Sequence, residues 1–149
     1  MISVRKLENE KDFNENLTRE NFVDFLFNHL DRFGDSKSAI SKSIDYAFSD
    51  EKGKGGFLLA AYDDDRLVGE LVMNSTGMEE YIPENFLVYV AVDGAVRNKG
   101  IGKKIVEAAV KESNGSVALH VEYDNPAKRL YERLGFTTKY AEMRLKKGE

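Results

Sequence analysis

The residues that decide the fold are VYVAVDGAVRNKGIGKKIVEAAV, from Val88 to Val110. The stretch begins with apolar residues on both faces, which is typical of a buried central strand, and it ends in a helical pattern. Between them lies RNKGIGKK, Arg97 to Lys104, which holds two glycines and four cations. The start of a helix exposes unpaired N–H groups that attract anions, and glycine lets a phosphate oxygen approach the backbone closely. The stretch therefore predicts a strand, a turn and a helix that together bind a phosphate.

Two common phosphate-binding motifs do not fit this turn. The P-loop needs a second glycine five residues after the first, but Lys99 stands at that distance from Gly94. The dinucleotide fingerprint needs a third glycine where this sequence has Ile105. The pattern that remains is R-x-x-G-x-G, Arg97 to Gly102, placed after a strand and at the start of a helix.

Composition and charge narrow the class of ligand. The chain of 149 residues has a length suited to one domain, residues 1–149, and it has no cysteine and only two histidines. We therefore expect no disulfide, no cysteine nucleophile and no metal. The net charge is −4 although Arg97 to Lys104 contributes +4, so the remainder carries −8. Because a nucleic-acid surface needs cations spread along a face, this concentration favours a small polyphosphate ligand over nucleic acid.

The expected location is the cytoplasm. No apolar stretch approaches the roughly 20 residues that a membrane-spanning helix requires. The first residues, MISVRKLENE, also lack the apolar core of a secretory signal peptide. We therefore expect no membrane partner.

The order of the expected elements indicates an α/β protein with a mixed sheet. Alternating apolar residues predict strands, and apolar spacings of three and four predict helices. Thr18 is placed to cap the first helix, with Asn21 at the capping-box position, and Gly34 is placed to end it. The expected elements, in the order β-α-α-β-β-β-α-β-α-β, are strand 2–7, helix 18–34, helix 36–48, strands 57–62, 67–74 and 86–92, helix 100–113, strand 116–122, helix 123–135 and strand 136–146.

A second motif, NPAKRLYERLGF, follows one helix and one strand after the glycine turn. Together with that turn, it resembles the GNAT superfamily of N-acetyltransferases, whose members bind the pyrophosphate of acetyl-coenzyme A through a [RQ]-x-x-G-x-[GA] turn. The resemblance covers Phe57 to Phe136 well and the N-terminal helices only in outline. The family's motif has an alanine three places after the asparagine, at the position of Lys128, whereas this sequence has its alanine one place earlier, at Ala127. The downstream motif agrees with the family at Asn125, Leu130, Tyr131, Gly135 and Phe136.

The resemblance implies a fold in which two central strands splay apart to admit acetyl-CoA. It also implies direct transfer of the acetyl group to an amine, without a protein nucleophile or a metal. The backbone of Val90 to Val92 would face the pantetheine arm, and the amide of Val92 would also donate to the oxyanion. The residues that the resemblance assigns to the binding of CoA are Val90, Val92, Arg97, Asn98, Lys99, Gly100, Ile101, Gly102, Lys103 and Asn125.

Tyr131 is the candidate general acid by the same resemblance. A phenol with a pKa of about 10 can reprotonate a thiolate leaving group when the two are within hydrogen-bond reach. Tyr131 also belongs to a helical stripe with Ala127, Leu130 and Leu134, which favours a core tyrosine, and the two roles are compatible. Helix capping alone would explain Asn125.

The sequence leaves the general base open. The strand before the turn reads ENFLVYV, with Phe86 where some family members have a carboxylate. His120 lies in the middle of an expected strand, where a structural role is favoured. Water can relay the proton instead. The remaining candidates are Glu70, Glu84, Tyr89 and Glu122.

By resemblance, the first two helices, the loop after the hairpin and the last strands select the acceptor. The loop contains Glu79, Glu80 and Glu84, so we expect a cationic amine on a small molecule or a peptide. One alternative is a CoA-binding sensor or partner-binding domain without turnover. Another keeps the chemistry with a longer acyl donor or an alcohol acceptor. Family members are often dimers, so a homodimer is the candidate assembly.

Overall fold

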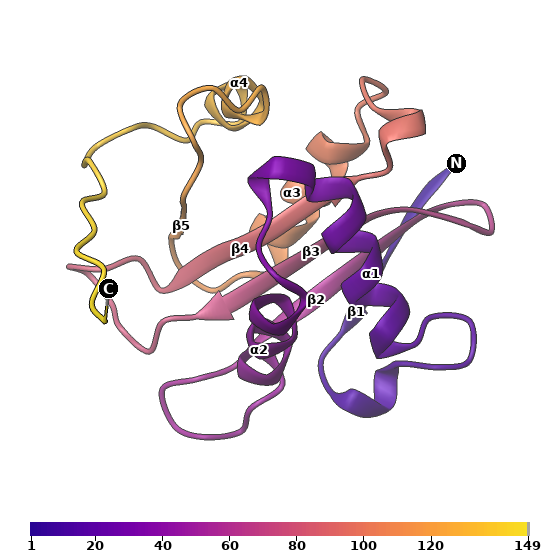
Figure 1. The fold of residues 1–149 in the computed structure, drawn as a ribbon, viewed down its shortest axis with the longest axis horizontal. Coiled ribbons are helices and arrows are strands. Elements are labelled where there is room, and N and C mark those ends of the chain that lie inside the picture. The colour runs from indigo at the N-terminus through magenta and orange to yellow at the C-terminus, as the bar shows by residue number, and fades with distance from the viewer. Residues whose placement is uncertain (149) are drawn as a thin grey trace.

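The computed structural model describes residues 1–148. Five strands form one sheet in the order β1-β2-β3-β4-β5 (Figure 1). The first four strands run antiparallel to their neighbours, and β5 pairs with β4 in parallel. The strands are β1 (Ile2–Leu7), β2 (Gly56–Asp63), β3 (Arg66–Ser75), β4 (Asn85–Val92) and β5 (Val117–Leu119). This mixed sheet confirms the expected fold class.

Helices cover both faces of the sheet. In Figure 1, α1 and α2 lie in front of the strands and α3 lies behind them. The helices are α1 (Arg19–Leu30), α2 (Lys37–Ala47), α3 (Ile101–Glu112) and α4 (Ala127–Arg133), with short 3-10 segments at Glu10–Asp12, Asp31–Phe33 and Gly94–Val96. None of the helices within residues 1–148 has the length and apolarity needed to cross a bilayer.

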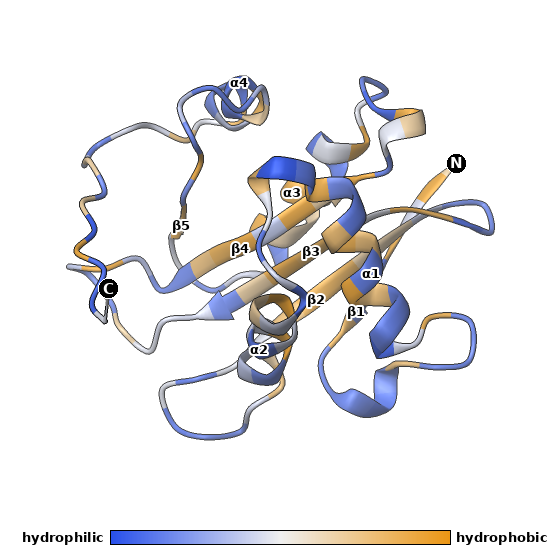
Figure 2. Cartoon of the chain, viewed as in Figure 1, coloured by the Kyte–Doolittle hydropathy of each residue, from blue (hydrophilic) through white to orange (hydrophobic). Residues whose placement is uncertain are grey.

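Each face of the sheet has its own hydrophobic core. Under α1 and α2, Phe22 and Ile44 pack with strand residues such as Val72. Under α3, Ile105 packs with residues such as Leu71. Figure 2 shows the same division, with apolar strands inside and mostly hydrophilic connections outside. The apolar side chains of both strand faces explain why the central strands read as continuous apolar runs.

The start of α1 forms as the sequence predicts. Thr18 Oγ1 accepts a hydrogen bond from the Asn21 amide at 3.0 Å, and Asn21 Oδ1 accepts one from the Thr18 amide at 3.3 Å. This reciprocal capping box satisfies amides that the first helical turn leaves unpaired. The α-helix ends at Leu30, before the expected Gly34, and residues 31–33 continue as a 3-10 turn.

The two central strands separate, as expected. β5 pairs with β4 only from Asn85 to Leu87, opposite Val117 to Leu119. The register between β3 and β4 also shifts between Val72 and Met73, which leaves Val88 as the extra residue of a bulge on β4. From Val88 onward, no strand within the described part of the chain pairs with β4 on its β5 side. We call this region, between the unpaired half of β4 and the chain that follows β5, the opening.

The last part of the chain differs from the expectation. The strand expected over 116–122 is only three residues long, and the strand expected over 136–146 does not form. A strand needs a neighbour to satisfy its backbone groups, and β5 is too short to template another one. Residues 136–148 are irregular, and Tyr140, Met143 and Leu145 are exposed. The observed order therefore ends on α4, which is also shorter than expected.

Candidate functional site

The glycine turn joins β4 to α3. Its first half is fixed by Asp93, which accepts a hydrogen bond from the Ala95 amide and pairs with Arg66 at 3.0 Å. Asn98 (φ 68°) and Gly100 (φ 79°) adopt the left-handed backbone conformation that Asn tolerates and Gly favours. Gly100 is the N-cap of α3 and has no side chain, so the first amides of α3 have no side-chain cap. These amides are available to an anion.

Unpaired cations surround the uncapped start of α3. Lys99, Lys103 and Lys104 are exposed, and none of them forms an ion pair within residues 1–148. Elsewhere, Arg19 and Lys128 are paired with carboxylates. A cluster of positive charge without internal partners, beside the positive end of a helix dipole, is suited to a polyphosphate.

Arg97 holds the turn in place through backbone carbonyls. Its Nε donates to the Val92 carbonyl at 3.1 Å, and its Nη2 donates to the His29 carbonyl. The ring of His29 accepts a hydrogen bond from the Gly94 amide at 3.2 Å. These contacts fix the end of α1 against the turn. His29 was not expected at this site, because the contacts join residues more than sixty positions apart in the sequence.

Gly102 allows α3, α4 and β4 to meet. A Cβ atom at this position would lie 3.2 Å from Leu130 Cδ2 and 3.7 Å from Val92 Cγ2. Val90 and Val92 belong to the unpaired half of β4, and their side chains pack toward the α3 face. Their backbone therefore borders the opening. Because the side chain of Ile101 is 4% exposed, a ligand at the turn would contact only its backbone.

Tyr131 lies on α4 and is the buried side chain of that helix. Its ring packs edge-on against Phe136, with 5.8 Å between centroids. Its hydroxyl has no hydrogen-bond partner within residues 1–148. Burial raises the pKa of Tyr131 to about 12, so the phenol keeps its proton at neutral pH. Nearby, Asn125 Oδ1 accepts a hydrogen bond from the Ala127 amide at 2.9 Å, which is a capping contact.

The candidate bases occupy different environments. Glu84 accepts a hydrogen bond from the Ser116 amide at 2.9 Å, which lowers the pKa of Glu84 and fixes the turn before β5. Glu122 is exposed in the segment after β5. His120 is exposed beyond the end of β5, and its ring contacts Phe86 with 4.7 Å between centroids.

Glu70 of β3 is the unusual carboxyl of this set. Its side chain is 0% exposed, and within residues 1–148 neither carboxyl oxygen has a hydrogen-bond partner. Burial without a partner raises its pKa well above the usual range, which favours the protonated carboxyl in the folded protein. Ala60 and Ala91 flank Glu70 on the neighbouring strands.

Tyr89, another candidate base, lies on β4 opposite Val72 and donates its hydroxyl to Asp35 Oδ2 at 2.6 Å.

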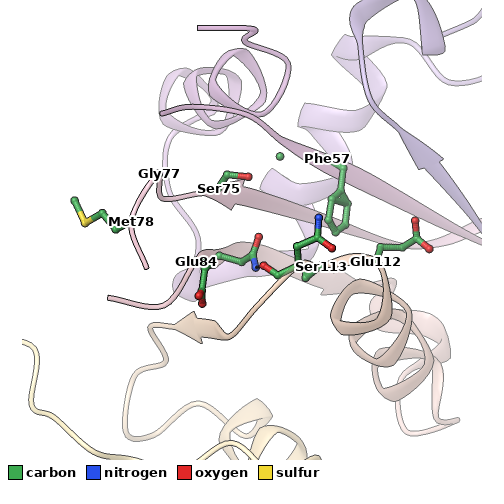
Figure 3. A pocket seen from close by; sticks show the side chains of 10 residues that line it. Phe57, Ser75, Gly77, Met78, Glu84, Glu112 and Ser113 are labelled. Atoms are coloured by element: carbon green, nitrogen blue, oxygen red, sulfur yellow. Dashed lines mark hydrogen bonds between the residues drawn. The ribbon is translucent and has the colours of Figure 1, made fainter. Parts of the chain in front are cut away.

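A surface cavity of about 340 Å³ lies elsewhere on the molecule (Figure 3). It gathers the end of β3, the start of β4 and the end of α3, whereas the glycine turn lies at the opposite ends of β4 and α3. The cavity is therefore separate from the glycine turn. Within residues 1–148, no group of His, Cys, Asp and Glu is arranged to hold a metal ion.

Known structures share this fold over nearly the whole chain. A transcriptional regulator from Bacillus halodurans C-125 is 17% identical, with a TM-score of 0.66 over 98% of this chain and 99% of that chain. A ribosomal-protein-alanine N-acetyltransferase from Brucella melitensis biovar Abortus 2308 is 16% identical, with a TM-score of 0.65 over 98% of this chain and 99% of that chain. An aminoglycoside N-acetyltransferase in complex with CoA is 15% identical, with a TM-score of 0.68 over 99% of this chain and 95% of that chain.

The family is shown by sequence rather than by these distant structures. A search of the curated proteins finds no match. Residues 54–138, more than half of the chain, match the model of a family described as the acetyltransferase (GNAT) domain. This range contains the glycine turn, the unpaired half of β4 and Tyr131. The chain therefore belongs to the GNAT family of acetyltransferases.

Proposed function

We propose that this protein transfers the acetyl group of acetyl-CoA to a primary amine of a small molecule or peptide. The observation that supports the proposal best is the separation of β4 from β5 after Leu87 and Leu119. The unpaired half of β4 leads directly to an uncapped helix start that is surrounded by unpaired lysines. An extended strand edge followed by an anion site matches a ligand with an amide-containing arm and a pyrophosphate.

The glycine turn and the unpaired half of β4 bind different parts of CoA in this proposal. The amides of residues 98–103, together with Lys99 and Lys103, hold the pyrophosphate. Arg97 keeps the turn in its binding conformation through the two carbonyls that it contacts, and it adds positive charge beside the phosphates. The backbone of Val90 and Val92 pairs with the pantetheine arm along the opening. Asn125 stands at the start of α4, across the opening from β4.

Tyr131 supplies the proton in this proposal. Acetyl-CoA provides the acetyl group as a thioester, the amine nitrogen forms the new C–N bond, and the C–S bond breaks. The sulfur then needs a proton, and the amine nitrogen, which attacks in its neutral form, loses one to water. Tyr131 is protonated at neutral pH, and its hydroxyl has no competing partner within residues 1–148. It is therefore suited to donate to the sulfur and to recover a proton from solvent.

The proposed acceptor is cationic at neutral pH. One solved structure of similar fold, an aminoglycoside acetyltransferase from an uncultured soil metagenomic sample, is in complex with sisomicin. In this chain, Glu79 and Glu80 are exposed in the loop between β3 and β4 and add negative charge to that end of the sheet. The carboxylate of Glu84 already accepts a hydrogen bond from the Ser116 amide, so Glu84 stabilises the turn before β5 rather than binding the acceptor.

The first test is calorimetric titration with acetyl-CoA, CoA and NADH. We expect the wild type to bind both forms of CoA and not NADH, and we expect Gly100→Glu with Gly102→Glu to abolish binding. The added carboxylates would repel the pyrophosphate and occupy the space that it needs. The matched control is Gly94→Ala, because a Cβ at Gly94 would meet nothing within 4 Å. A folded wild type that does not bind CoA would contradict the proposal.

Binding alone would not separate an enzyme from a CoA sensor. The second step is therefore to measure the release of free CoA thiol with a panel of amines. Turnover with any amine, lost in Tyr131→Phe, supports an acetyltransferase. Tight binding of acetyl-CoA without turnover on the panel would instead support a sensor or partner-binding domain.

A further inference from the structure

The connection between α1 and α2, residues 31–36, lies over the unpaired half of β4. Just before it, at the end of α1, the ring of His29 accepts a hydrogen bond from the glycine turn at the end of β4. At its end, Tyr89 of β4 donates to Asp35. Tyr89 lies just beyond Leu87, the last residue of β4 that pairs with β5. The connection therefore follows β4 from the end of the strand back to the beginning of the opening.

The same connection reaches across the opening. Arg32 Nη2 lies 3.0 Å from Asp124 Oδ2, and Asp124 belongs to the segment between β5 and α4. Asp31 has φ 54° and ψ −131°, a conformation that residues other than glycine rarely adopt. Such strain persists only where the surrounding structure holds it, and it is frequent at functional sites. The connection is thus held at both sides of the opening.

Asp35 is fixed in this connection without being neutralised. Its Oδ2 accepts the hydroxyl of Tyr89 at 2.6 Å, and Tyr89 is only 8% exposed. No cation within residues 1–148 forms an ion pair with Asp35, whereas Asp124 at the same opening is paired with Arg32. A carboxylate can accept several hydrogen bonds, so Asp35 can still bind a cationic donor.

We infer that Asp35 binds the ammonium group of the amine acceptor. The inference rests on the proposed function and adds a specificity-determining residue to it. A neutral phenol orients the carboxylate and leaves its charge intact, and a charge-assisted hydrogen bond to an ammonium group is about twice as strong as a neutral one. Tyr89 and Asp35 lie on the α1–α2 face of β4, next to the backbone of Val90. The acceptor would therefore reach the opening from that face, and its reacting nitrogen passes one proton to water before it attacks the thioester.

The test compares variants that change charge or orientation separately. Asp35→Asn keeps an oxygen that can accept from Tyr89 and removes the charge. Tyr89→Phe keeps the charge and removes the group that orients it. Asp50→Asn is the matched control, because Asp50 is an exposed carboxylate in the loop after α2. The probes are spermidine, sisomicin and a peptide with a free α-amino group, and calorimetry with acetyl-CoA is run on every variant.

We expect Asp35→Asn to raise KM by about tenfold or more for the probes that the wild type acetylates. The substitution removes the charge-assisted hydrogen bond between the carboxylate and the ammonium group of the probe. Tyr89→Phe should raise KM by about threefold, and Asp50→Asn should leave it unchanged. The affinity for acetyl-CoA should stay within about twofold in all three variants.

Three outcomes would overturn the inference. An unchanged KM in an active Asp35→Asn enzyme would reject the role of Asp35 and leave the proposed function intact. An equal loss of acetyl-CoA affinity would place Asp35 on the cosubstrate side instead. A wild type that binds acetyl-CoA but acetylates none of the probes would contradict this inference together with the proposed function.

Discussion

Residues 1–112 and residues 113–148 are built in different ways. The N-terminal region, residues 1–112, contains four long strands and three helices, and almost every buried side chain belongs to it. In the C-terminal region, residues 113–148, β5 pairs with β4 over three residues, and Tyr131 is the one residue whose side chain is buried. Because apolar burial is the main stabilising contribution, the N-terminal region must hold most of the stability. The C-terminal region instead supplies the candidate acid and one side of the opening.

Changing Tyr131 to Phe would separate the contribution of the C-terminal region to catalysis from its contribution to stability most clearly. The ring and its contact with Phe136 remain, so the free energy of unfolding should change by less than about 1 kcal/mol. The loss of a positioned proton donor should lower kcat by about 10²- to 10⁴-fold. Steady-state assays and urea unfolding measure the two effects. Tyr123→Phe is the control, because Tyr123 is 81% exposed in the same region. Full activity of Tyr131→Phe would remove Tyr131 from the chemistry.

Changing Gly102 to Val would disturb the contact between the two regions. The added side chain would press on Leu130 of α4 and on Val92 of β4. Overpacking of this kind costs about 1–3 kcal/mol, which corresponds to about a 5- to 150-fold loss of acetyl-CoA affinity if the displaced helix borders the ligand. Calorimetry measures the affinity. Relative to the wild type, hydrogen exchange should become faster in α4 by more than in β2 and β3. Uniform destabilisation of both regions would contradict the division.

Changing Glu70 to Gln would test the interior of the N-terminal region. The folded pKa of Glu70 is raised above its unfolded value, so the folded state keeps a proton that the unfolded state loses as pH rises. The contribution of Glu70 to stability is therefore complete below about pH 4.5 and is lost as pH rises toward the folded pKa, by up to about 1.4 kcal/mol per pH unit.

Glu70→Gln cannot titrate, so its stability relative to the wild type should increase between pH 5 and pH 7. Urea unfolding at several pH values measures this difference. A difference that does not change with pH would show that Glu70 is ionised in the folded protein or hydrated there.

Changing Arg32 to Ala should have the smallest effect on stability. Arg32 and Asp124 are both mostly exposed, and an exposed ion pair contributes less than about 1 kcal/mol. We expect the free energy of unfolding to stay nearly constant while hydrogen exchange becomes faster in the segment between β5 and α4. A large loss of stability would show that the pair couples the two regions more strongly than its exposure indicates.

Local patterns predicted the N-terminal region well. The capping box at Thr18, the hairpin of β2 and β3 and the glycine turn depend on residues that are close in sequence. The strand expected over 136–146 was wrong because alternation does not supply a partner strand. Family resemblance, rather than periodicity, assigns Tyr131 a role beyond the core, and that role stays a prediction.

Contacts between distant residues could not be predicted from the sequence. Glu70 has apolar neighbours in sequence, but a charged residue in a strand is usually exposed, and only the structure shows that it is enclosed. The pair of Asp35 and Tyr89 joins residues 54 positions apart, and no local motif marks it. Arg97 was expected to hold phosphate, and its bonds to two backbone carbonyls became visible only in three dimensions.

The unpaired half of β4 has a further consequence for solubility. From Val88 to Val92, this strand pairs with no strand on its β5 side within residues 1–148, as at a sheet edge, although it lies inside the strand order. Free edges pair readily with other extended chains, and the bulge at Val88 and the short length limit this risk without removing it. If the pantetheine arm occupies this edge, bound acetyl-CoA also protects the protein from self-association. Light scattering on heating should then rise earlier without acetyl-CoA than with it, and identical curves for a protein that binds acetyl-CoA would exclude such protection.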